Sequence, residues 1–182
     1  MTSNDYWQRL PPFDYVVTYS FNRGPKLQRL KQAAAELRQA TQVELMTARF
    51  MRQRLLGQRM EELAQFDQRQ DVPLTTAAGS FDITASPVTQ FARTDEHTER
   101  LRSILTTPVS SNWAAGCRPV FRDALGFHDS AGHIVEVLNI CLQCHYLQSE
   151  SGQLIEADAS VYDQLRQLLG ALGHPIETHH EQ

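Results

Sequence analysis

The segment from Lys26 to Asp67 constrains the fold of this chain most, because it contains no proline and only one glycine, Gly57. Proline and glycine are the residues least compatible with the interior of a helix. Apolar residues recur along the segment at three- and four-residue steps, and this stripe consists of Leu27, Leu30, Ala34, Leu37, Met46, Phe50, Leu56, Met60 and Leu63. The spacing predicts one long helix, or two helices with a break near Gly57.

The length of this predicted helix indicates a partner. A helix of about forty residues is about 60 Å long, which exceeds the width of a domain of this size. The rest of the chain therefore cannot cover the whole apolar stripe. We expect the helix around residues 26–67 to contact a protein partner or a second copy of the chain.

The segments on either side of this helix differ in character. Aromatic and branched residues alternate with smaller or polar ones over residues 13–21, which is the period of a half-buried strand. Asn22 to Pro25 then form a turn into the helix. Residues 71–93 contain two prolines and a glycine among many Thr, Ser and Ala residues. We interpret them as an irregular linker or covering loop, with a short strand at Phe81–Thr84.

The last third of the chain predicts a helix, a β-hairpin and a closing helix. A short helix is expected over residues 94–106, with its apolar residues on one side. Residues 120–128 and 133–146 are strand-like, and the sequence Asp-Ser-Ala-Gly between them is typical of a hairpin turn. The closing helix begins at Asp158 or Ser160, because both residue types are good helix caps.

The order of these elements gives the fold class. Strand, long helix, loop, helix, two strands and helix indicate an α+β fold, in which a small antiparallel sheet with a central C-terminal hairpin is packed by a long N-terminal helix and shorter helices. The predicted regions are 1–70 with the strand and the long helix, 71–93 as linker or covering loop, 94–176 as a compact hairpin region with clustered cysteines, and 177–182 as a polar tail.

All three cysteines lie in the hairpin region, at Cys117, Cys141 and Cys144, and His145 follows directly. Three thiolates and one imidazole are enough to fill a tetrahedral site, so these four residues are the candidate ligands of one structural zinc ion. No residue can be assigned a catalytic role from spacing alone. Whether the chain is an enzyme stays open at this point.

The predicted hairpin also indicates how the thiols meet. With a loop centred on Ser130 and Ala131, Cys117 faces Cys144 across the two strands, at a separation that suits a disulfide or a shared metal. Cys141 then lies on the opposite face unless the strand bends, since residues three apart point to opposite sides. Two alternatives to zinc remain. The cysteines are inert core residues, or Cys117 forms a redox pair with Cys141 or Cys144.

Three stretches of this region resemble a group of uncharacterised bacterial proteins. They are Cys117-Arg-Pro-Val-Phe, Leu125-Gly-Phe-His-Asp-Ser-Ala-Gly-His-Ile-Val and Asn139-Ile-Cys-Leu-Gln-Cys-His145. Proteins of that group have a Cys/Pro strand start, an Asp-x-x-Gly hairpin and a strand that ends in Ile-Cys-Phe-x-Cys. The resemblance covers residues 94–176, and this chain departs from it with Leu142 at the aromatic position. It implies that the three thiols form a unit, and it implies no known activity.

Charge is distributed unevenly along the chain. Residues 26–70 carry nine Lys or Arg and five Asp or Glu, whereas residues 71–182 carry six and fourteen. The net charge of −4 and the pI of 6.0 lack the basic surplus that binds phosphate backbones, so nucleic acid is not an expected partner. No apolar run is long enough to span a membrane and no signal peptide is recognised. We therefore expect a cytoplasmic protein without a membrane partner.

Together these features favour a soluble, non-catalytic interaction or structural module. Its thiol cluster would bind zinc or stabilise the sheet, and its long helix would bind a partner. The alternative is a thiol-disulfide enzyme or redox sensor that uses Cys117 with Cys141 or Cys144.

Overall fold

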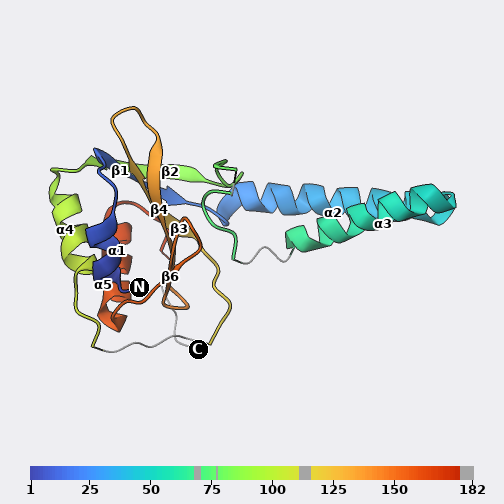
Figure 1. Ribbon diagram of the computed structural model, residues 1–182. Helices are drawn as coiled ribbons and strands as arrows, with labels where there is room; N and C mark the ends of the chain where they lie inside the picture. Colours follow the sequence, from blue (N-terminus) through green and yellow to red (C-terminus); the bar gives the residue numbers. More distant parts are fainter. Residues whose placement is uncertain (68–70, 77, 111–115, 177–182) are drawn as a thin grey trace.

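The computed structural model describes residues 1–67, 71–76, 78–110 and 116–176, and Figure 1 shows its ribbon. The helices are α1 (Ser3–Arg9), α2 (Gly24–Thr47), α3 (Phe50–Asp67), α4 (Glu96–Leu105) and α5 (Ala159–Ala171). The strands are β1 (Tyr15–Ser20), β2 (Ser86–Ala92), β3 (Asp123–His128), β4 (Ile134–Cys141), β5 (Tyr146–Ser149) and β6 (Leu154–Ile155). The predicted polar tail, 177–182, lies outside the described residues.

The strands form a single sheet in the order β2-β1-β3-β4-β5-β6, and every neighbouring pair is antiparallel. The predicted α+β class is thereby confirmed. The β3–β4 hairpin occupies the centre of the sheet, as expected, because both of its outer edges are paired with further strands.

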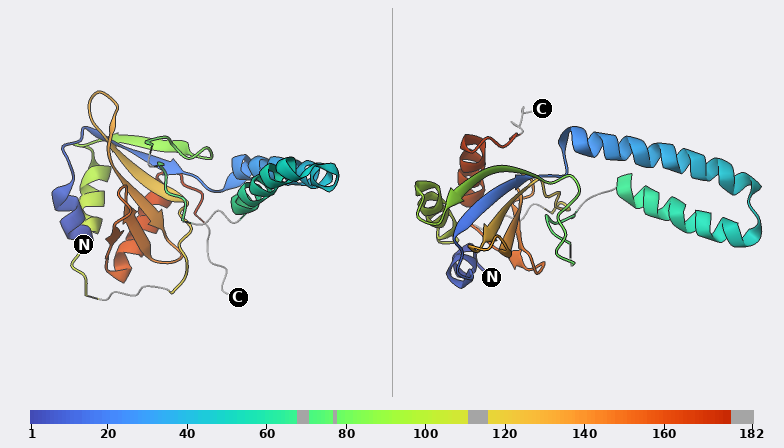
Figure 2. Two further views of the ribbon diagram at one scale, coloured as in Figure 1. Left: turned by 45° about the vertical axis from the view of Figure 1, so that its right-hand side comes forward. Right: turned by 90° about the horizontal axis from the view of Figure 1, so that it is seen from above.

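Helices α1, α4 and α5 gather on one side of the sheet (Figures 1 and 2). Their apolar residues form one core with Leu125, Leu138 and Ile140 of the central hairpin. In α5 the buried residues recur on one stripe and are Val161, Tyr162, Leu165, Leu168 and Leu169. Asp158 caps this helix by accepting a hydrogen bond from the backbone N–H of Ser160.

The opposite face of the sheet is covered by the loop of residues 71–85. Leu74 of this loop is fully buried, in a second core that includes Phe121 and Val137. Asn139 of β4 is also fully buried, and its Oδ1 accepts a hydrogen bond of 2.7 Å from the backbone N–H of Leu74. The central strand β4 is therefore covered on both faces.

The strand predicted at Phe81–Thr84 is wrong. Phe81 makes only an isolated bridge with Thr75, and the strand of this region is β2, which pairs with β1. Pro87 interrupts the strand pattern of β2, so this strand is not recognisable in the sequence. Because β2 lies at the edge of the sheet beside an irregularity in the β1 register, a proline is tolerated there.

Helices α2 and α3 fold back on each other and project from the rest of the chain (Figures 1 and 2). We call these two helices the arm and the remaining described residues the body. The chain turns at Ala48, which has an extended backbone (φ −73°, ψ 148°), whereas Gly57 lies inside α3. The two helices bury Ala34, Thr41 and Leu56. Tertiary packing of this kind outweighs local helix propensity and ends α2 where the sequence has no helix breaker.

The single helix of about 60 Å is therefore wrong, and the alternative of two helices is confirmed with a different break. The N-terminal helix is long, with 24 residues. It does not pack along the sheet, however, and it extends away from it (Figure 2). The arm covers part of its own apolar stripe.

The register of the central hairpin differs from the prediction. A loop centred on Ser130 and Ala131 would place Gly126 opposite Val135, but Gly126 pairs with Val137. The pairing shifts between Phe127 and His128, where Val135 is an extra residue on β4. In the turn, Oδ1 of Asp129 accepts a hydrogen bond of 2.8 Å from the backbone N–H of His133. The shift changes which residues of β3 and β4 are neighbours along the whole hairpin.

Candidate functional site

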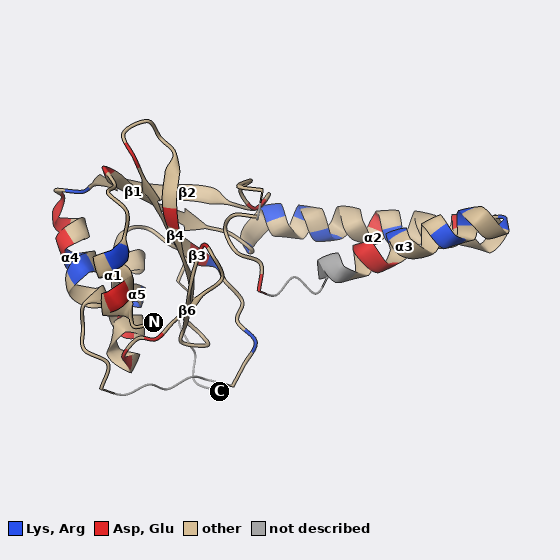
Figure 3. Ribbon diagram, viewed as in Figure 1, with Lys and Arg blue, Asp and Glu red and all other residues tan. Residues whose placement is uncertain are grey.

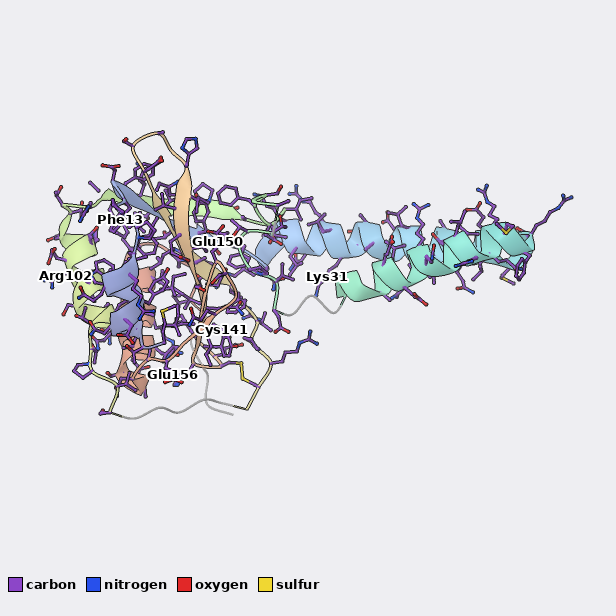
Figure 4. All side chains as sticks on the ribbon, in the orientation of Figure 1. Phe13, Lys31, Arg102, Cys141, Glu150 and Glu156 are labelled. Carbon is purple, nitrogen blue, oxygen red and sulfur yellow. A yellow bond between two sulfur atoms is a disulfide. The ribbon has the colours of Figure 1, made fainter. Side chains whose placement is uncertain are left out.

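Two of the three cysteines form a disulfide. Cys117 and Cys144 are bonded through their Sγ atoms, and their Cα atoms lie 5.9 Å apart (Figure 4). Cys141 is a free and buried thiol. The predicted pair is therefore correct, although the strand register from which it was inferred is wrong.

A turn after β4, rather than a cross-strand pairing, brings the two bonded cysteines together. β4 ends at Cys141, residues 142–145 form the turn, and β5 runs back beside β4. The strand predicted over residues 133–146 is therefore too long: it contains β4, the turn and only the first residue of β5, Tyr146. Cys117 lies in the irregular segment before β3, 27 positions from Cys144. The disulfide consequently ties the segment before β3 to the turn that follows β4.

The four predicted zinc ligands do not fit a metal site. A disulfide sulfur is not a thiolate, so Cys117 and Cys144 do not act as zinc ligands in this state. His145 stacks its ring on Tyr162, with the ring centres 4.6 Å apart and the planes 7° apart. Within the part of the chain that the structure describes, no three His, Cys, Asp or Glu side chains converge as a metal ion would require.

Cys141 belongs to the core. It is 2% exposed and lies in the second core cluster with Val17 and Val137, beneath the loop of residues 71–85. Burial raises the pKa of the Tyr162 hydroxyl, and Cys141 adds a smaller contribution in the same direction. Of the alternatives drawn from the sequence, the core position is the part that the structure shows for Cys141.

A group of polar side chains is buried where β1, β3 and the segment after α5 meet. Nδ1 of His174 lies 2.6 Å from Oδ1 of Asp123, and its Nε2 lies 2.8 Å from Oγ1 of Thr18. Arg23 forms an ion pair with the same carboxylate. Hydroxyl, imidazole and carboxylate follow one another as in the triads of hydrolases. The side chain of His174 is fully buried and Thr18 is 0% exposed, so the hydroxyl and the imidazole are enclosed by the fold. Arg23 and Asp123 line a small hollow beside them.

This polar group was not predicted. Its members are separated by 51 positions between Asp123 and His174, and by 156 between Thr18 and His174. No periodic pattern links residues so far apart. The only local signal is the position of His174 directly after Gly173, which ends α5 with a φ of 92°.

The far end of the arm carries a concentration of exposed apolar side chains. We define the tip as residues 43–59, which are the end of α2, the connection and the first part of α3. Its exposed members are Val43 (63%), Met46 (79%), Phe50 (82%), Met51 (74%) and Leu55 (66%). Single exposed apolar residues are common, whereas five of them within the tip make this end of the arm a candidate interaction site.

The tip is also positively charged (Figure 3). Residues 43–59 contain four arginines and one acidic residue, Glu44. Arg52 pairs with Glu44. For the described residues, no ion pair joins Arg49, Arg54 or Arg59 to an acidic side chain.

Among the described helices, none has both the length and the apolar character that a bilayer-crossing helix needs. Comparison of the chain with protein-family models, with curated proteins and with solved structures found no match. What the chain does is therefore inferred from its own geometry.

Proposed function

We propose that this chain is a non-catalytic interaction module that binds a protein partner through the tip of its arm. The observation that carries the proposal is the exposure of five large apolar side chains at one end of the molecule. Removing apolar surface from water lowers the free energy, so covering these side chains with a partner provides the driving force for binding. The arm places this surface far from the body, where a partner can approach both helices (Figure 1).

The body supports this role by fixing the start of the arm. Arg23 precedes α2, and its guanidinium donates hydrogen bonds to the carbonyl oxygens of Pro175 and Arg122, at 2.7 and 3.1 Å. Lys26, in the first turn of α2, donates to the carbonyl oxygen of Ala85 at 2.9 Å. These contacts join the start of the arm to the segment after α5, to Arg122 just before β3 and to the covering loop of residues 71–85.

Site-specific photo-cross-linking in the cells that make the protein tests the proposal. A photoreactive amino acid replaces Phe50 at the tip in one version. The control version carries it at Lys31, which is exposed on the part of the arm nearer to the body (Figure 4). We expect a discrete protein adduct from position 50 that is absent from position 31. Loss of the adduct on adding Met51→Asp would identify the tip as the contact, and equal labelling from both positions would contradict the proposal.

A second candidate function follows from the disulfide. In a cytoplasm that keeps thiols reduced, a cysteine pair that forms a disulfide is usually catalytic or redox-sensing. An external dithiol would reduce the bond with two electrons and two protons, leaving thiols at Cys117 and Cys144 and a disulfide on the dithiol. Differential alkylation of protein taken from cells before and after oxidant treatment measures this change. A pair that stays oxidised throughout would favour a purely structural bridge.

A further inference from the structure

We infer that the surface bound at the tip is an acidic, amphipathic helix of a partner protein. This inference rests on the proposed interaction function and adds the chemistry of the partner. It combines two properties of the tip, its exposed apolar groups and its unpaired positive charge.

The apolar part is suited to a helix. Met51 and Leu55 are one helical turn apart on α3 and line a hollow together with Arg52, Arg54 and Gln58. Helices that bind in grooves insert apolar side chains at one-turn spacing into surfaces of this kind. Methionine is unbranched and flexible, so a surface rich in it adapts to the side chains that it covers.

The charge of the tip requires an acidic complement. Four arginines and one glutamate give residues 43–59 a net charge of +3. Arg52 is paired, whereas Arg49, Arg54 and Arg59 have no ion pair in the described chain. A partner with carboxylates around its apolar residues would pair with them, and charge complementarity of this kind sets specificity and the rate of association.

Two copies of the tip are a poor match for each other. A two-fold contact brings the same patch of both copies together. The arginines of one tip would then face those of the other without the carboxylates needed to pair with them. The charge therefore favours a different chain over tip-to-tip self-association.

A lipid surface and a nucleic acid fit less well. Helices that lie on membranes separate their apolar and basic residues onto two faces. Successive residues of an α-helix are about 100° apart around the helix axis. Arg54 therefore lies between Phe50 and Met51 around α3, and the apolar and basic residues are interleaved on one face. Protein surfaces that bind nucleic acid contact its phosphate backbone with basic side chains. They do not need five exposed apolar side chains.

Synthetic peptides test the inference with the full chain. The first probe is a labelled amphipathic helix of Leu and Glu, the second has Lys for every Glu, and the third has Ser for every Leu. We expect only the first to bind by fluorescence anisotropy, more weakly as salt is raised. Arg54→Glu and Phe50→Asp should each weaken it by about tenfold or more, whereas Lys31→Glu, the matched charge change outside the tip, should change it little.

Several outcomes would overturn the inference. They are failure of the Leu-Glu peptide to bind, equal binding of the Lys peptide, equal loss in Lys31→Glu, and preferential binding to phosphatidylserine vesicles or duplex DNA. A dimer in light scattering that Phe50→Asp dissociates would assign the tip to a second copy instead. If the tip still cross-links a protein through position 50 while the acidic peptide does not bind, the proposed function stands and this inference falls.

Discussion

Asp123 and His174 are 51 positions apart in the sequence, yet Nδ1 of the imidazole lies 2.6 Å from the carboxylate, and both side chains are almost completely buried. The contact ties the segment after α5 to the first residue of β3. Arg23 pairs with the same carboxylate at the start of the arm. One carboxylate thus connects the sheet, the closing segment and the arm.

Removal of this carboxylate should destabilise the fold strongly. Asp123→Ala leaves Arg23 and His174 without their acidic partner, and a broken buried ion pair costs about 3–5 kcal/mol. His174→Ala removes the contacts of the imidazole with both Asp123 and Thr18 and should cost about 1–3 kcal/mol. Urea unfolding of the two single variants and the double variant measures both effects. We expect the double variant to lose less than the sum of the two, and additive losses would contradict the contact.

The disulfide should contribute stability through the loop that it closes. Cys117 and Cys144 are 27 positions apart, and a loop of that length corresponds to about 3–4 kcal/mol in the unfolding free energy. Cys117→Ser and Cys144→Ser should each lose this amount. Cys141→Ala should keep the bridge, as judged by mass spectrometry after alkylation without reduction. Loss of the bridge in Cys141→Ala would show that Cys141 takes part in it.

Gly126 is needed because two side chains close over it. A Cβ at this position would lie 3.0 Å from Cε2 of Tyr19 and 3.1 Å from Nε2 of His128. Gly126→Ala should therefore cost about 1–3 kcal/mol through overpacking. Gly57→Ala is the matched control, since a Cβ there meets nothing within 4 Å. In thermal unfolding we expect it to stabilise α3 by about 0.5–1 kcal/mol, because alanine favours helix more than glycine does.

The covering loop should open when Asn139 is replaced. Its Oδ1 is the acceptor for the backbone N–H of Leu74, and both residues are fully buried. Asn139→Ala leaves that N–H without its partner, at a cost of about 1–3 kcal/mol. Amide hydrogen exchange at Leu74 should become faster. Ile83→Ser, which alters a side chain of the same loop that is 65% exposed, should leave this exchange rate unchanged.

Tyr6 should make the fold sensitive to alkali. Burial raises the pKa of its hydroxyl well above that of free tyrosine, with smaller contributions from Glu136 and Glu150. The folded-state pKa is above the unfolded one, so this contribution is complete below about pH 10 and is lost as the pH rises further. Tyr6→Phe should reduce the alkaline loss in denaturant titrations.

At neutral pH the same substitution should cost little. The Tyr6 hydroxyl is buried and has no hydrogen-bond partner among the described residues, so its removal leaves no group unsatisfied. Tyr6→Ala, which also removes the ring from the core, should cost about 3–5 kcal/mol. A large loss in Tyr6→Phe at neutral pH would indicate that the hydroxyl has a partner.

Elements with a strong local period could be predicted from the sequence. The buried stripe of α5 follows from Leu165, Leu168 and Leu169, and its start follows from the capping residue Asp158. The alternation in β1 and the hairpin composition likewise placed strands near their observed positions. Edge strand β2 could not be recognised, because Pro87 interrupts its pattern and only its position in the sheet makes that residue acceptable.

The candidate site was partly predictable. The sequence identified Cys117 and Cys144 as neighbours, but the reason lies in the turn at residues 142–145 and not in strand pairing. The stripe of apolar residues in the arm predicted a need for a partner. Which of those residues are exposed depended on how the helices fold back, and this left Met46 and Phe50 exposed while Leu56 became buried.

The sequence by itself determined the helical character of the arm, helices α4 and α5, strands β1, β3 and β4 and the α+β class, because each depends on a pattern within one segment. It did not predict α1, β2, β5 or β6. The tertiary structure alone decided where the arm turns, what covers the second face of the sheet and which polar groups meet at Asp123. These features depend on contacts between residues far apart in the chain. Such contacts form only when the whole sheet is assembled, and their energy can outweigh the local preference of any single segment.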